Sequence, residues 1–77
     1  MNKENRKKIE EFVTKLEDIK SGIEDMQAGE EDKYDNLPEG IQDSEKGEAI
    51  CDAIENLSCA ASSLEESIDY LNDTIGN

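Results

Sequence analysis

Residues 49–76 decide the fold, because they read AICDAIE, NLSCAAS, SLEESID and YLNDTIG, a repeat of seven residues. The second place of each group is a large aliphatic residue, and the sixth is Ile or Ala. These residues are Ile50, Leu57, Leu64 and Leu71 in the second place, and Ile54, Ala61, Ile68 and Ile75 in the sixth. Such a repeat predicts a helix that packs lengthwise on another helix. The fifth place adds a lane of small residues, which widens the face toward that of a helix bundle: Ala53, Ala60, Ser67 and Thr74.

A second apolar pattern runs through residues 9–26 in steps of three and four residues. It predicts a first helix with one lane at heptad position a and another at position d. The a lane is Ile9, Leu16 and Ile23, and the d lane is Phe12, Ile19 and Met26, with Val13 beside them.

Turn chemistry separates the two patterns, since Asp35-Asn36 and Leu37-Pro38 disfavour a continuous helix. Pro38 is a candidate first residue of a short helical turn. Asp43 and Ser44 are candidates for the N-cap of the second helix. We expect Tyr34, Leu37 and Ile41 to fold over the end of the structure. The sequence thus predicts helix 1 over about 4–32, a loop over about 33–43 and helix 2 over about 44–75.

These elements predict one all-α domain over residues 1–77, an antiparallel two-helix hairpin. Two helices alone bury little apolar surface, so we expect self-association into a four-helix bundle or a higher oligomer. The alternative is a monomer that completes its core against a partner protein. The expected oligomer interface lies on the second helix and consists of Ile50, Ala53, Ile54, Leu57, Ala60, Ala61, Leu64, Ile68 and Leu71.

The composition excludes several classes of function. The chain has 21 acidic and 8 basic residues, no His and a net charge of −13, which is the wrong sign for direct binding of nucleic acid. No apolar run is long enough to cross a membrane, and no apolar segment follows the basic start to make a signal peptide. Without His or a CxxC pair we expect no metal, no cofactor and no enzyme activity. Cys51 and Cys59 are too far apart along one helix for a disulfide, which fits a cytoplasmic protein.

Acidic pairs recur every seven residues on the first helix, on the side away from its apolar seam. We call these residues the acidic ridge. They are Glu10, Glu11, Glu17, Asp18, Glu24, Asp25, Glu31 and Asp32. One interpretation is a solvated face that only keeps the chain soluble. The other is an anionic surface that competes for a basic groove on another protein, in the manner of a DNA mimic.

The stretch Tyr34-Asp35-Asn36-Leu37-Pro38-Glu39, then Ser44-Glu45-Lys46-Gly47-Glu48 and the heptads up to Asp69-Tyr70-Leu71, carries a resemblance. Residues 34–75 resemble a family of small acidic coiled-coil proteins of phages, prophages and plasmids of Gram-positive bacteria. The resemblance implies an accessory protein that inhibits a bacterial defence system, such as an anti-CRISPR protein, inside the infected host. Its partner would be a host protein with a basic groove, for example a defence effector that binds nucleic acid.

Two other functions stay open. The Leu37-Pro38 turn that leads into an Ala/Leu helix also resembles the hairpin of phage sponge proteins, which sequester cyclic nucleotide signals. That resemblance implies a ligand site in the loop, formed by Lys33, Tyr34 and Lys46 at a junction between subunits. The third hypothesis is a structural module whose hairpin docks on another coiled coil through the lane of Ala53, Ala60 and Ser67.

Overall fold

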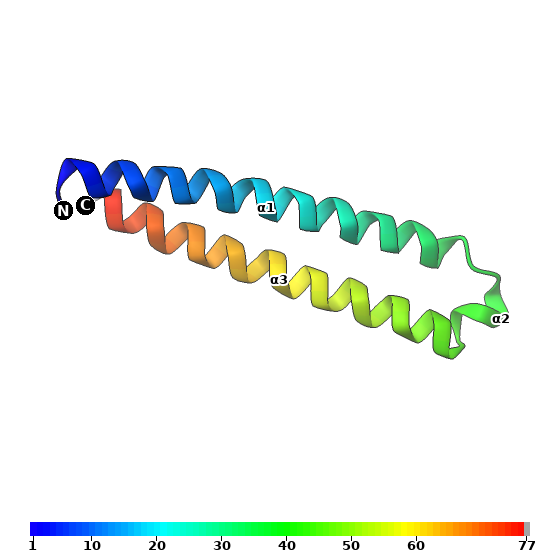
Figure 1. Cartoon of the computed structure of the whole chain (residues 1–77). Helices are drawn as coiled ribbons and strands as arrows, with labels where there is room; N and C mark the ends of the chain where they lie inside the picture. The colour runs from blue at the N-terminus through cyan, green and yellow to red at the C-terminus, as the bar shows by residue number, and fades with distance from the viewer. Residues whose placement is uncertain (77) are drawn as a thin grey trace.

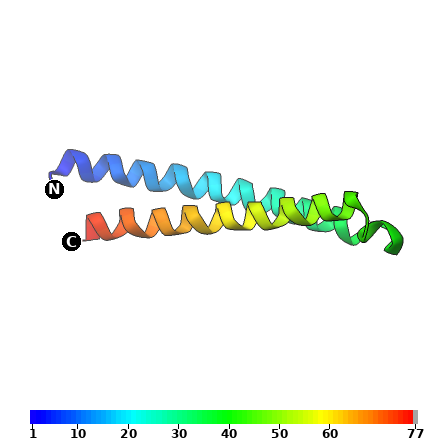
Figure 2. The ribbon, with the colours of Figure 1, turned by 90° about the horizontal axis from the view of Figure 1, so that it is seen from below.

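The computed structural model describes residues 1–76, which form two long antiparallel helices and a short connecting helix (Figure 1). Helix α1 spans Lys3–Asp35, α2 spans Glu39–Gln42 and α3 spans Glu45–Gly76. The start of α1 and the end of α3 lie at one end of the hairpin, and α2 lies at the other (Figures 1 and 2). The predicted all-α antiparallel hairpin is confirmed. Helix α1 continues past its predicted end near residue 32, and the helical turn predicted after Pro38 is α2.

Helix α3 packs on α1 through the two lanes that its heptads predict. Ala61 and Ile68 are buried, with 6% and 4% of their surface exposed. The other residues of the two lanes are half-buried, namely Ile50, Ile54, Leu57, Leu64, Leu71 and Ile75. We assign heptad position a to the lane of Ala61 and Ile68, and position d to the lane of Leu57 and Leu64.

The contact surface of α1 is rotated by one lane from the predicted one. Ile9, Leu16 and Ile23 face α3 and are half-buried, as expected. Phe12, Ile19 and Met26 do not, since they stay 51%, 54% and 61% exposed, so the prediction of this second lane is wrong. Its place is taken by the residues four positions after Ile9, Leu16, Ile23 and Glu30. These residues are Val13, Lys20, Gln27 and Tyr34. In the contact register of α1 this lane is a, and Ile9, Leu16 and Ile23 are d.

Two polar contacts between the helices accompany this rotation. Lys20 Nζ lies 3.2 Å from a carboxylate oxygen of Glu65 on α3. At the open end, Arg6 Nη1 donates a hydrogen bond of 2.8 Å to the backbone carbonyl oxygen of Ile75. Both contacts need the lane of Arg6, Val13 and Lys20 to face α3, and turning α1 to bury Phe12 and Ile19 would break them. Charged hydrogen bonds of this kind are each stronger than neutral ones.

The connector is held by a close approach of the start of α3 to the end of α2. Gly47 is buried, and a Cβ atom at this position would lie 1.9 Å from the backbone oxygen of Gln42, so no side chain fits. Gln42 Nε2 in turn donates a hydrogen bond of 3.1 Å to the carbonyl oxygen of Tyr34. Tyr34 and Leu37 are half-buried as expected of the plug, whereas Ile41 remains 41% exposed. At the predicted N-cap, the Ser44 hydroxyl donates to the Ile41 carbonyl.

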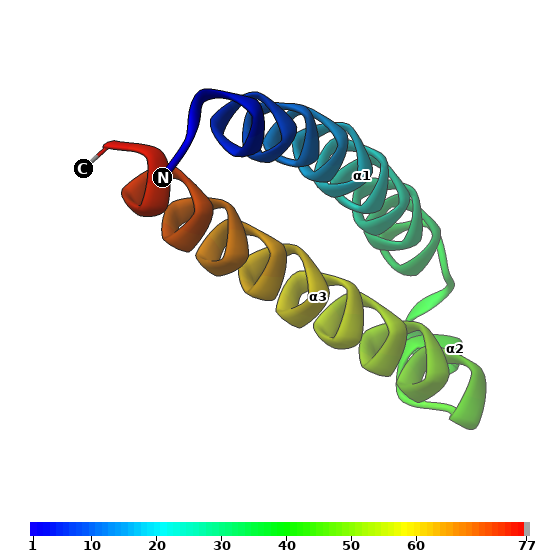
Figure 3. The ribbon, with the colours of Figure 1, turned by 60° about the vertical axis from the view of Figure 1, so that its left-hand side comes forward.

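The hairpin is long and thin, with extents of 58 × 14 × 13 Å and a radius of gyration of 17.4 Å. A compact chain of this length has a radius of gyration of about 11.5 Å. Among the described residues, the buried apolar core consists of Val13, Ala61 and Ile68. The short α2 covers only the loop end and leaves both broad faces of the α1–α3 pair open (Figure 3).

Candidate functional site

The hairpin has two different broad faces, which follow from the heptad register of the contact. In an antiparallel helix pair, the e positions of both helices border one face and the g positions border the other. A surface depression confirms this for the e side, because it is lined together by Glu17 and Glu24 of α1 and by Glu65 and Asn72 of α3. Lys20 lies in the middle of this depression.

Acidic residues avoid one of these faces entirely. The c and g positions of both helices form it, and we call it the acid-free face; none of its residues is Asp or Glu. On α1 they are Asn5, Lys8, Phe12, Lys15, Ile19, Gly22, Met26, Gly29 and Lys33, and on α3 they are Lys46, Ala49, Ala53, Asn56, Ala60, Ser63, Ser67, Tyr70 and Thr74. In a chain of net charge −13, the acids of α1 and α3 therefore lie on the other face and at the outer edges, except Glu30, which is half-buried at a d position beside this face and pairs with Lys33.

The structure brings the acidic ridge together as one exposed strip along α1. Its first members, Glu10, Glu17, Glu24 and Glu31, occupy e positions and border the face formed by the e and b positions of both helices, which we call the acidic face. Its second members, Glu11, Asp18, Asp25 and Asp32, occupy f positions at the outer edge of the helix. All of them are exposed. Since α1 rises about 1.5 Å per residue, one pair follows the next at roughly 10 Å.

Helix α3 extends this negative surface only in part. Glu65 and Asp69 line the same depression as Glu17 and Glu24, so they share the face that the ridge borders. Glu55 occupies a b position and belongs to that face as well. Asp52, Glu66 and Asp73 occupy f positions at the outer edge of α3, away from α1. The negative charge thus wraps around three sides of the hairpin rather than filling every gap of the ridge.

Lys20 lies at an a position between the helices, at the border of the acidic face. Its ammonium group lies 3.2 Å from Glu65 and 3.7 Å from Glu24. The hydrogen bond to Glu65 raises the pKa of Lys20 above its usual value, and the charges of Glu24 and Glu65 add to this effect against partial burial. Glu31 accepts a hydrogen bond of 3.2 Å from Gln27 Nε2. These contacts hold Glu24 and Glu31 in place along the ridge.

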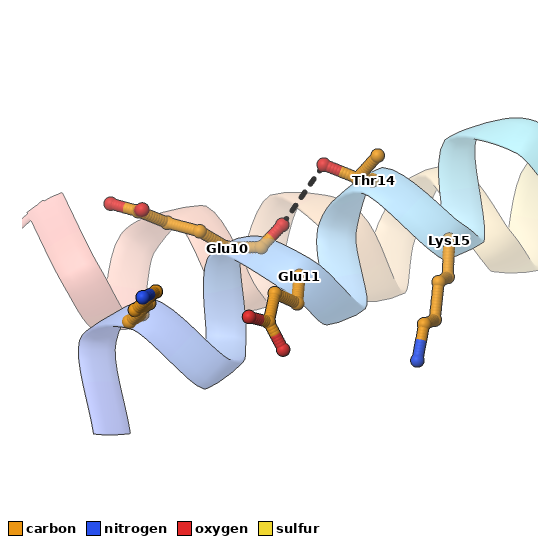
Figure 4. Close-up of a pocket in the computed structure, with 5 residues that line it drawn as sticks. Glu10, Glu11, Thr14 and Lys15 are labelled. Carbon is orange, nitrogen blue, oxygen red and sulfur yellow. Dashed lines mark hydrogen bonds between the residues drawn. The ribbon is translucent and has the colours of Figure 1, made fainter. Parts of the chain in front are cut away.

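Near the start of the ridge, Lys7, Glu10, Glu11, Thr14 and Lys15 line a shallow surface depression. Figure 4 shows that Glu10, Glu11, Thr14 and Lys15 all project from α1, with α3 behind it. The Thr14 hydroxyl donates a hydrogen bond of 3.1 Å to the Glu10 carbonyl oxygen of its own helix. A depression lined by one helix encloses nothing, so this region is an open contact surface and not a substrate pocket.

The predicted oligomer interface on α3 is largely used inside the hairpin. Ala61 and Ile68 are buried against α1, and Ile50, Ile54, Leu57, Leu64 and Leu71 are half-buried there. Of the predicted interface residues, Ala53 and Ala60 belong to the lane of small residues at g. Ala60, Ser67 and Thr74 are exposed along that lane.

The predicted loop site for a nucleotide is assembled in part. Lys33 and Lys46 line one depression at the loop end, together with Asp32, Leu37 and others. Lys33 Nζ lies 3.0 Å from a carboxylate oxygen of Glu30, which partly neutralises the charge of Lys33. Tyr34 does not line this depression; it occupies an a position in the contact with α3, and its pKa is raised chiefly by the charge of Cys51. The structure therefore separates Tyr34 from the two lysines.

Residues 1–76 hold neither a cluster of metal ligands nor a membrane-spanning helix. No group of His, Cys, Asp and Glu in this part of the chain has the geometry of a metal site. Within the same residues, no helix is long and apolar enough to span a lipid bilayer. Cys51 and Cys59 are exposed free thiols. Comparison of the chain with protein-family models, with curated proteins and with solved structures gives no match.

Sequence reasoning missed two features of this surface. The division into an acidic and an acid-free face needs the contact register, which the pattern of α1 alone does not determine. The second is the position of Lys20, a charged residue that lies inside the contact between the helices. A signal was present in the sequence, since Lys20 and Gln27 follow Val13 at intervals of seven residues.

Proposed function

We propose that this protein inhibits another protein by occupying a basic, nucleic-acid-binding surface with its acidic ridge. The observation that carries the proposal is the spacing of eight exposed carboxylates in pairs along one straight helix, without a basic residue among the e and f positions from Glu10 to Asp32. Such a strip attracts a basic groove at long range and fits along it. The resemblance to phage accessory proteins supports a bacterial defence effector as the target.

The dimensions support an elongated groove as the binding site. The ridge runs for about 33 Å at 1.5 Å per residue. Its repeat of roughly 10 Å is longer than the spacing of adjacent phosphates along one strand, so the ridge would match a groove whose basic residues are spaced more widely than successive phosphates. Lys20 stays outside the strip because Glu65 and Glu24 hold it. Binding of this kind would weaken steeply with salt.

The test is capture of proteins from a bacterial host lysate by the tagged chain at low and moderate salt. The variant Glu17→Lys, Asp18→Lys reverses one pair of the ridge, and Asp52→Lys, Glu66→Lys makes the same change in charge at the outer edge of α3. We expect a captured protein that the first variant loses and the second retains. That protein should also release nucleic acid when the wild-type chain is added. Equal capture by both variants would remove the ridge as the binding site.

A second candidate is the nucleotide sponge, which the shared depression of Lys33 and Lys46 favours. Two lysines from different helices could contact a phosphate group if a second subunit supplied further donors. A panel of cyclic nucleotides tests this, because a ligand that binds the folded chain raises its Tm. We expect a shift that Lys46→Gln abolishes; no shift with any member of the panel excludes the sponge.

A further inference from the structure

The acid-free face carries the largest exposed apolar side chains of α1. Phe12, Ile19 and Met26 are 51–61% exposed and recur every seven residues at position g. They lie directly beside the half-buried d lane of Ile9, Leu16 and Ile23. The two lanes together form the apolar seam seen in the sequence, of which α3 covers only one side. Tyr70, at 69% the most exposed aromatic side chain, is on the same face.

Each bulky residue of α1 on this face is matched by a small residue of α3. The ion pair of Lys20 with Glu65, and the depression that Gln27 lines together with Ser58, fix the levels of the two helices. By this register Phe12 is level with Thr74, Ile19 with Ser67 and Met26 with Ala60. The face is therefore a row of large side chains beside a parallel row of small ones. Rows of this kind complement each other when one face is laid on a second copy of itself.

The charge distribution selects the same face. Two copies of a chain with net charge −13 repel each other, and contact through the acidic face or the outer edges would bring carboxylates together. The acid-free face is the part of the two long helices on which that repulsion is least. Of its own basic residues, Lys8 and Lys15 occupy c positions at the rim, and Lys33 and Lys46 occupy g positions at the loop end.

The accessible surface of the chain exceeds that of a compact monomer by about the area that one partner would bury. The accessible surface of the described chain is 5638 Å². A compact monomer of 8.6 kDa has an accessible surface of about 4,700 Å² by the general scaling with mass. The excess of about 900 Å² is close to the roughly 800 Å² that each partner loses in a standard protein interface. Burial of one broad face would thus bring the chain to the exposure of an ordinary globular protein.

We propose that the acid-free face is the site at which a second copy of this chain docks, forming a symmetric four-helix bundle. The two-fold axis runs parallel to the helices, so that α1 of each copy lies over α3 of the other. Phe12, Ile19 and Met26 of one copy then insert along Ala60, Ser67 and Thr74 of its partner. Every neighbouring pair of helices is antiparallel, and each helix contributes its a, d and g positions to the core. The ridge and the acidic face stay on the outside of both copies, so this inference is independent of the proposed function.

The mass in solution tests the existence of the dimer. Light scattering at about 100 μM should give twice 8.6 kDa for the wild-type chain. Ile19→Lys puts a charge into the apolar row and should weaken association about a hundredfold or more. Ser21→Lys makes the same change in charge at an exposed b position of α1 and should leave the dimer intact. A monomeric wild-type chain, or equal association of both variants, overturns the proposal.

Cross-linking between copies tests the arrangement. In a chain with Cys51→Ser and Cys59→Ser, one sample carries Met26→Cys and a second carries Ala60→Cys. After mixing and mild oxidation we expect a disulfide between the two different chains. The control mixes Asp25→Cys with Glu66→Cys, at the outer edges, and should give none. If Ile19→Cys instead cross-links efficiently to itself, α1 lies on α1 and the proposed axis is wrong.

Discussion

The two long helices of this hairpin use their apolar residues differently. Both contact lanes of α3 are apolar, and α1 covers them as the heptads predict. Helix α1 has as strong a seam, but it presents only one lane of it to α3, and the other contact lane holds Lys20, Gln27 and Tyr34 after the buried Val13. A heptad pattern therefore identifies the apolar residues of a helix but not which neighbour covers them. Where a chain has a second neighbour, the seam divides between two contacts.

The largest effect is expected from truncating the best-buried side chain of α3. Ile68 is 4% exposed, and Ile68→Ala should lower the free energy of unfolding by about 2–4 kcal/mol, because it loses burial and leaves a cavity. The neighbouring Ser67→Ala, on an exposed position, is the control and should change it little. Urea unfolding followed by circular dichroism measures both. A cost for Ile68→Ala no larger than that for Ser67→Ala would contradict the contact described.

A smaller loss is expected where α3 meets the connector. Gly47→Ala places a Cβ against the Gln42 carbonyl and should cost about 1–3 kcal/mol through displaced backbone. Gly22 is the matched control, since nothing lies within 4 Å of its Cβ position on α1. Gly22→Ala should stabilise the helix by about 0.5–1 kcal/mol. Thermal unfolding of the two variants should thus move in opposite directions; a shift of the same sign would refute the close approach.

A third substitution makes the contact lane of α1 more apolar, as the lanes of α3 are. Gln27→Leu adds an apolar side chain to the contact lane near Ala61 and should raise the free energy of unfolding by about 0.5–1 kcal/mol, after loss of the exposed hydrogen bond to Glu31. Ala28→Leu adds an apolar side chain at an exposed position and serves as the control. Urea midpoints distinguish them. Equal midpoints would show that Gln27 does not lie in the contact.

The smallest effect is a loss of stability in alkali. The pKa values of Lys20 and Tyr34 are both raised in the folded chain, by Glu65 and by the charge of Cys51 respectively. A raised pKa means that the folded state binds the proton more tightly. Its contribution is complete below the unfolded pKa values, about 10 for both groups, and falls as the pH rises through the folded values. Thermal unfolding from pH 8 to 11 measures this, and Lys20→Gln should flatten the decline.

Much of the fold follows from the sequence because its signals are local. The seven-residue groups of 49–76 and the turn at Leu37-Pro38 give the number, order and direction of the helices. The rotation of α1 does not follow, since Phe12 and Val13 are neighbouring apolar residues and the pattern of α1 alone does not say which of them faces α3. The close approach at Gly47 also depends on where α2 lies. Likewise, the acidic pairs are evident in the sequence, whereas the acid-free face appears only once both registers are known.

The uneven contact between α1 and α3 has a consequence for the order of folding. Pairs near the connector, such as Tyr34 and Cys51, close a short loop of chain, whereas Val13 and Ile68 lie far apart in the sequence. The longer loop costs about 1 kcal/mol more in chain entropy. The best-buried apolar residues are thus the last to meet. The contacts nearer the connector must form before the burial of these residues contributes to stability. The hairpin should therefore fold and unfold as one unit rather than fraying residue by residue from its open end.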